Sequence, residues 1–166
     1  MAPEALVGAL PSLLSYVVSF VYVGIYWNNH HHLLQAAEHG SGGILWANLH
    51  LLVWLSLAPF ATAWMGQNHV ASAPVAFYGF ILLFAGIAYF VLTRSLVAGH
   101  RKDSALAISV GKDRKGGLSI VLYAVAIPVA FMRVSIAYAC YVLVAVMWLL
   151  PDPRLERIMH ERNRHV

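Results

Sequence analysis

Formal charge is almost absent from the first half of this chain, and that gap limits what the chain can fold into. Between Glu4 and Arg94 the only charged side chain is Glu38. Soluble proteins carry about 25% charged residues, whereas this chain carries 11%. A bilayer can solvate such a surface, provided that backbone hydrogen bonds close within each segment. The pattern predicts an all-α integral membrane protein.

Apolar runs show where the chain crosses the bilayer, because a membrane-spanning helix needs about 20 apolar residues. A fourth and longer run follows three runs of ordinary length. The three ordinary runs cover residues 10–27, 44–65 and 73–93. We expect each of them to be one transmembrane helix.

The fourth run, residues 118–150, is too long for one ordinary helix. Arg133 lies near its middle, and Pro128 comes shortly before. A charged side chain at mid-bilayer is costly, so we expect the chain to turn back in a tight hairpin at Arg133. This divides the run into two short spans, residues 118–132 and 134–150.

Lysine and arginine residues indicate the orientation, because they collect on the cytoplasmic side of membrane proteins. Six of the eleven lie at residues 94–117 and four at residues 151–166. A hairpin at Arg133 puts both groups on the same side, whereas a single helix over 118–150 would separate them. We therefore predict one domain, residues 1–150, with about five transmembrane helices, an outside N-terminus and a cytoplasmic C-terminal tail.

Composition also excludes several classes of function. The net charge of +4 follows from this membrane topology, so we expect no nucleic-acid partner. The single cysteine, Cys140, cannot form an internal disulfide or a two-cysteine metal site. The predicted spans contain no paired carboxylates, no phosphate-binding glycine loop and no nucleophile with a base. We expect neither an enzyme nor a bound metal or cofactor.

Polar side chains form a stripe along the first predicted span. The stripe consists of Ser15, Ser19, Tyr22, Tyr26 and His30. Spacings of three and four residues keep side chains on one face of a helix. The stripe could line a hydrated ion pathway, or its hydroxyls could form hydrogen bonds to neighbouring helices in lipid. Both interpretations stay open from the sequence.

Histidines 30 to 32 follow Trp27 at the cytoplasmic end of this span. Neighbouring residues on a helix point about 100° apart, so the three cannot all bind one metal ion. We expect hydrogen bonding there, with Asn48 of the second span as a partner for His30 or His31, because a buried asparagine in a membrane needs one. His30, His31 and Asn48 together form a predicted polar packing network. A haem protein with paired histidines is a less favoured alternative.

Two further positions concern helix packing. Pro59 in the second span is expected to kink its helix, since proline removes a backbone hydrogen bond, and Thr62 could bond to a carbonyl there. Gly79 and Gly86 in the third span allow another helix to approach closely.

Several polar and aromatic positions resemble a known family in their order along the chain. They are Ser-Tyr-Val-Val-Ser-Phe at 15–20, Trp-Asn-Asn-His-His at 27–31, Leu-Trp-Ala-Asn-Leu at 45–49, Pro-Phe-Ala-Thr at 59–62, Gly66, and Trp-Leu-Leu-Pro at 148–151 followed by Arg154. This series resembles the prokaryotic branch of the transmembrane protein 175 family of potassium channels. The resemblance covers nearly the whole chain and is strongest over residues 15–66.

The resemblance implies helices two to six of a six-helix subunit, in a homotetramer that passes potassium ions through a prokaryotic cell membrane. The family's first helix, with an Arg and a Phe-Ser-Asp-Gly motif, has no counterpart here. His30, His31 and Asn48 match positions that pack against that motif. Potassium conduction is thus the leading hypothesis. A non-conducting accessory or structural membrane protein, and a haem-binding redox protein, are the alternatives.

Overall fold

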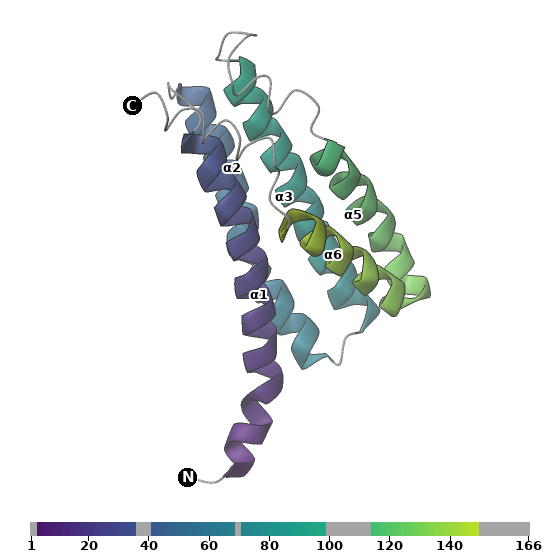
Figure 1. Cartoon of the computed structure of the whole chain (residues 1–166). Helices are drawn as coiled ribbons and strands as arrows, with labels where there is room; N and C mark the ends of the chain where they lie inside the picture. The colour runs from purple at the N-terminus through teal and green to yellow at the C-terminus, as the bar shows by residue number, and fades with distance from the viewer. Residues whose placement is uncertain (1–2, 36–40, 69–70, 99–113, 150–166) are drawn as a thin grey trace.

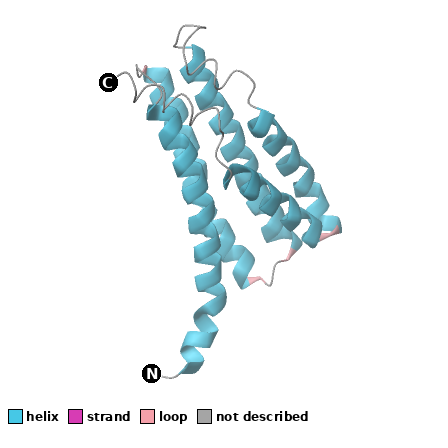
Figure 2. Ribbon diagram, in the orientation of Figure 1, coloured by secondary structure: helices cyan, strands magenta, loops and turns pink. Residues whose placement is uncertain are grey.

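Five helices form the part of the chain that the computed structural model describes, which is residues 3–35, 41–68, 71–98 and 114–149. They are α1 (Pro3–Gln35), α2 (Gly42–Gln67), α3 (Ser72–Ala98), α5 (Arg114–Met132) and α6 (Val134–Leu149). Figure 2 shows these residues as helix with a few short loop segments and no strand. The predicted all-α fold of five helices is confirmed. The predicted tail, residues 151–166, lies outside the described residues.

Three of the described helices are long and apolar enough to cross a membrane. They are α2, α3 and the Lys115–Met132 portion of α5. Helix α6 is apolar but has 16 residues, so it extends only about 24 Å. The hydrocarbon core of a bilayer is about 30 Å thick. Helix α1 is not among the three candidate spans either. The membrane crossings of α1 and α6 therefore stay predictions from the sequence.

Helix α1 is longer than the span predicted within it, residues 10–27. It has 33 residues and extends about 50 Å. The apolar pattern marks the part that suits lipid, and it does not mark where helical hydrogen bonding ends. Polar residues such as Asn29 and Gln35 continue the helix beyond the apolar run.

The turn between α5 and α6 consists of Arg133 alone. Its N–H donates to the carbonyl of Val129 at 2.8 Å, and its own carbonyl accepts from the N–H of Ile136 at 3.0 Å. The residue therefore completes the last turn of one helix and begins the first turn of the next. Its side chain is exposed, so the charge lies at the end of the bundle and outside the core.

The helices pack in chain order and then close on themselves. Helix α2 lies between α1 and α3, α3 packs against α5, and α6 turns back from α5 to contact α3 and α1. Figure 1 shows neighbouring helices running in opposite directions, with α6 crossing obliquely towards α1. Arg133 lies at one end of the bundle, whereas Arg94, late in α3, and Lys115, early in α5, lie at the other.

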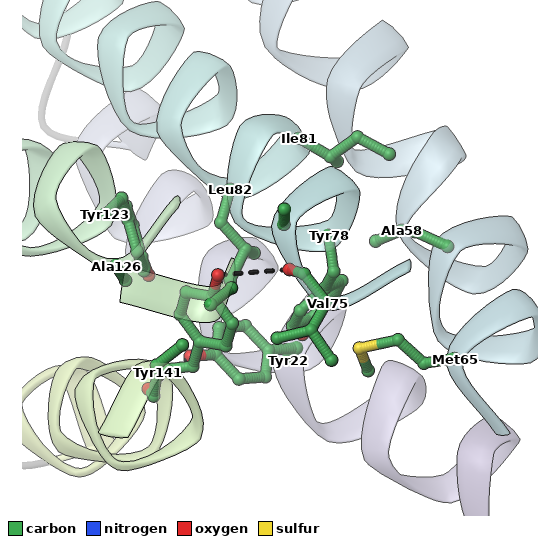
Figure 3. Packing of buried hydrophobic residues seen from close by; sticks show 14 of the residues in the cluster. Tyr22, Ala58, Met65, Val75, Tyr78, Ile81, Leu82, Tyr123, Ala126 and Tyr141 are labelled. Carbon is green, nitrogen blue, oxygen red and sulfur yellow. Dashed lines mark hydrogen bonds between the residues drawn. The ribbon is translucent and has the colours of Figure 1, made fainter. Parts of the chain in front are cut away.

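The core has two parts. One lies around Leu51, Leu55, Leu92 and Leu96, mainly between α2 and α3. The other joins all five helices and is built around buried tyrosines, as Figure 3 shows. The tyrosines come from four different helices: Tyr22, Tyr78, Tyr123 and Tyr141.

Gly79 makes the tyrosine core possible. The ring of Tyr141 lies so close to this glycine that an added methyl group would meet the Cζ atom at 2.9 Å, and the hydroxyl would be closer still. The Tyr141 hydroxyl donates to the carbonyl of Val75 at 3.1 Å, so the ring cannot move away without losing a buried hydrogen bond. Helix α6 can thus pack against α3 at this point because α3 has no side chain there.

Replacing Gly79 by alanine should therefore destabilise the bundle. Overpacking of this kind costs about 1–3 kcal/mol. Gly86→Ala is the matched control, since its added methyl group would lie 3.5 Å from the nearest atom, an ordinary contact with Ile120. Thermal unfolding in detergent should show a clear loss of stability for Gly79→Ala and little change for Gly86→Ala. Equal stability of the two variants would contradict the packing described for Tyr141.

Candidate functional site

The polar stripe of α1 faces the interior of the bundle. Ser19, Tyr22 and His30 are buried and Tyr26 is partly buried, while the opposite face of α1 presents exposed apolar side chains such as Val17 and Val21. Ser15 lies on the same helix, but its side chain is outside the described part of the structure. The stripe therefore meets other helices of its own chain.

Tyr22 is the member of the stripe with the clearest partner. Its hydroxyl donates to the backbone carbonyl of Tyr141 in α6, and its ring lies edge-on to Tyr78 at 5.8 Å. Ser19 is also buried, but its hydroxyl has no hydrogen-bond partner among the described residues, and nor does that of Tyr78. The stripe thus includes the satisfied hydroxyl of Tyr22 and the buried, unsatisfied hydroxyl of Ser19.

Sequence reasoning did not single out the other tyrosines of this core. Tyr78 and Tyr141 lie edge-on at 5.5 Å, and Tyr123 and Tyr141 lie at 6.2 Å. A signal did exist, because a tyrosine inside a membrane span has to place its hydroxyl near a partner. That signal shows that a partner is needed without showing which helix supplies it.

The structure brings His30 and Asn48 together. His30 Nε2 donates to Asn48 Oδ1 at 2.5 Å, joining α1 to α2. His31 points the other way and stacks on Trp27, with ring centroids 5.1 Å apart. The 100° rotation between consecutive helix residues thus separates two neighbouring histidines into one inward and one outward side chain.

Asn29 is a further polar residue of α1, for which no contact was predicted from the sequence. Its amide Nδ2 donates to the carbonyl of Ile25 at 2.8 Å and, over a longer 3.5 Å, to the carbonyl of Trp148 in α6. The indole N–H of Trp148 donates to Ser119 Oγ at 2.8 Å. The end of α6 is therefore held by α1 on one side and by α5 on the other.

Helix α2 continues without interruption through Pro59. The Thr62 hydroxyl donates to the carbonyls of Ala58 and Pro59, each at 3.0 Å. The carbonyl that a proline leaves without its usual N–H partner is four residues earlier, at Leu55. Thr62 therefore satisfies its own hydroxyl within α2, using carbonyls one turn away from the one that Pro59 affects.

Two of the described histidines, His30 and His50, form side-chain hydrogen bonds. His50 Nε2 accepts from the indole N–H of Trp54 at 3.0 Å, and His30 is bonded to Asn48. Among the residues that the structure describes, no three histidine, cysteine, aspartate or glutamate side chains gather as metal ligands.

Comparison with known proteins decides the family. Residues 2–59 match the family described as endosomal/lysosomal potassium channel TMEM175. A curated potassium channel from Chryseobacterium sp. (strain P1-3) is 47% identical over 152 residues, which cover 92% of this chain and 79% of that protein. The chain belongs to the TMEM175 family. The sequence-based resemblance to this family is thereby confirmed.

A more distant relative is also named a potassium channel. A curated potassium channel from Streptomyces collinus (strain DSM 40733 / Tue 365) is 25% identical over 155 residues, which cover 87% of this chain and 74% of that protein. No solved structure matches the chain. Family and relatives together place the protein among membrane proteins of potassium transport and point to a channel rather than an enzyme.

Asn48→Ala should lower the stability of this TMEM175 protein, because it removes the acceptor of the partly buried hydrogen bond from His30. Such interhelical bonds are worth ~1 kcal/mol in membrane proteins, and the buried His30 ring would be left without its partner. The measurement is thermal unfolding in detergent. Asn28→Ala is the control, because Asn28 is an exposed asparagine two residues before His30 in α1. A loss of stability in the control equal to that of Asn48→Ala would contradict the role of the His30–Asn48 bond.

Proposed function

We propose that this chain is the subunit of a homo-oligomeric channel that conducts potassium ions passively across a prokaryotic cell membrane. The observation that carries the proposal is the 47% identity to a curated potassium channel over 92% of this chain. The bilayer and potassium ions would be its partners. Tetrameric assembly is part of the proposal through the family resemblance.

The packing of a single chain supports an assembly with its pathway between subunits. The polar stripe of α1 turns into the bundle, and the cavity beside it measures about 10 Å³. A volume of that size admits a single water-sized body, and it cannot form a continuous route for ions. We therefore place the proposed potassium pathway between surfaces contributed by more than one copy of the chain.

Two roles were open for Ser15, Ser19, Tyr22 and Tyr26. The bond from Tyr22 to Tyr141 and the burial of Ser19 support a packing role within the subunit for this stripe. His30 and Asn48 then act in the same way, by joining α1 to α2. We propose that these residues hold the subunit in the shape that the assembly needs.

Potassium flux into proteoliposomes tests conduction directly. Purified chain should give potassium-preferring flux above that of sodium and above the leak of empty vesicles. The protein must be shown to be folded and oligomeric by size-exclusion chromatography in the same preparation. Absence of flux from such a sample would contradict conduction by these helices and favour a non-conducting accessory or structural member of the family.

We also propose that the bundle end with Arg94 and Lys115 is cytoplasmic and that Arg133 lies outside. Basic residues favour the cytoplasmic side, and the structure separates Arg133 from the other two along the bundle. Single-cysteine variants can be made after Cys140→Ala, because Cys140 is the only cysteine. Arg133→Cys should react with an impermeant thiol reagent on intact cells, and Arg94→Cys only after permeabilisation. The opposite labelling pattern would reverse the orientation.

A further inference from the structure

A small cavity lies where α1 and α6 run side by side. Two hydrogen bonds join these helices, from the Tyr22 hydroxyl to the Tyr141 carbonyl and from Asn29 Nδ2 to the Trp148 carbonyl. The two donors are seven residues apart on α1, and the two acceptors are seven residues apart on α6. The cavity is lined by residues from this interval on both helices, so the two bonds mark its upper and lower limits.

Aromatic rings from four helices form much of the wall. Tyr26 lies edge-on to Tyr89 with centroids 6.3 Å apart, and Tyr89 lies edge-on to Trp148 at 5.4 Å. Tyr123 of α5 lines the cavity as well, and Val144 and Ala145 line it from α6. No lining residue carries a formal charge. The wall is therefore built mainly of ring and aliphatic carbon.

Three polar groups next to the cavity are engaged with protein atoms. The indole N–H of Trp148 donates to Ser119, the Asn29 amide donates to two carbonyls, and the Tyr22 hydroxyl donates to Tyr141. A bound water needs two to four polar partners, and a cation needs compensation for its lost hydration. An apolar occupant needs neither, because dispersion contacts with the rings are sufficient.

We propose that this α1–α6 cavity is a binding site for small neutral apolar molecules, such as haloalkanes, that reach it from the bilayer. The cavity is partly open, and its volume is about 10 Å³, near the least that one water-sized body requires. A larger occupant has to move α1 away from α6. The two side-chain bonds described above join α1 to α6 in this interval and resist that movement. Binding does not require the chain to conduct ions.

Quenching of Trp148 by halothane tests the site in the full-length protein in detergent. Trp148 lines the cavity, whereas the other four tryptophans do not, so the difference between wild type and Trp148→Phe gives its fluorescence. This component should be quenched with a saturable dependence on halothane concentration. Ala145→Leu adds a side chain to the cavity wall and should remove the saturable component. Ala139→Leu makes the same substitution on the exposed side of α6 and should leave it unchanged.

Ala145→Gly keeps the test independent of overpacking. It enlarges the cavity, so half-saturation should occur at a lower halothane concentration than in the wild type. Circular dichroism and size-exclusion chromatography establish that each variant is folded. The site is disproved if Trp148 quenching in the wild type is linear with concentration. It is also disproved if folded Ala145→Leu and Ala145→Gly both keep the wild-type saturation curve.

Discussion

Tyr141 connects three helices at one point, and the rest of the bundle is arranged around it. Its hydroxyl donates to the Val75 carbonyl of α3, and its own carbonyl accepts from Tyr22 of α1. In lipid there is no water to take over such bonds, so these polar groups have to find partners within the protein. Gly79 allows the ring to reach α3. This one contact therefore sets how α6 crosses back over the bundle.

The side-chain bonds of α1 connect it to the helices on either side. His30 bonds to Asn48 of α2, while Tyr22 and Asn29 bond to carbonyls of α6. Helix α1 thus joins α2 to α6, the first described helix after it to the last. The potassium-channel proposal gives this arrangement a purpose, because an oligomer needs each subunit to present a fixed outer surface to its neighbours. The small α1–α6 cavity lies between the two hydrogen bonds that join α1 to α6.

Much of the fold could be predicted from the residues. Five helices follow from apolar runs, and the structure places the break between α5 and α6 at Arg133, where the sequence predicts a hairpin. Helix ends were harder, as α1 shows, because polar residues continue a helix that has left the apolar run. His30 and Asn48 could be paired because they lie on consecutive helices joined by a short connection, which limits how far apart they can be.

The sequence by itself determined that the chain is a helical membrane protein, since only lipid can solvate so long a stretch without charge. It also determined which side chains share the inner face of α1, because helical periodicity fixes positions along one helix. Only the tertiary structure decided what that face meets. Tyr22 and Tyr141 are 119 residues apart in the chain, and periodicity along one helix does not specify which distant helix lies opposite. That choice depends on the close packing of side chains such as Tyr141 against Gly79, which exists only once all five helices are assembled.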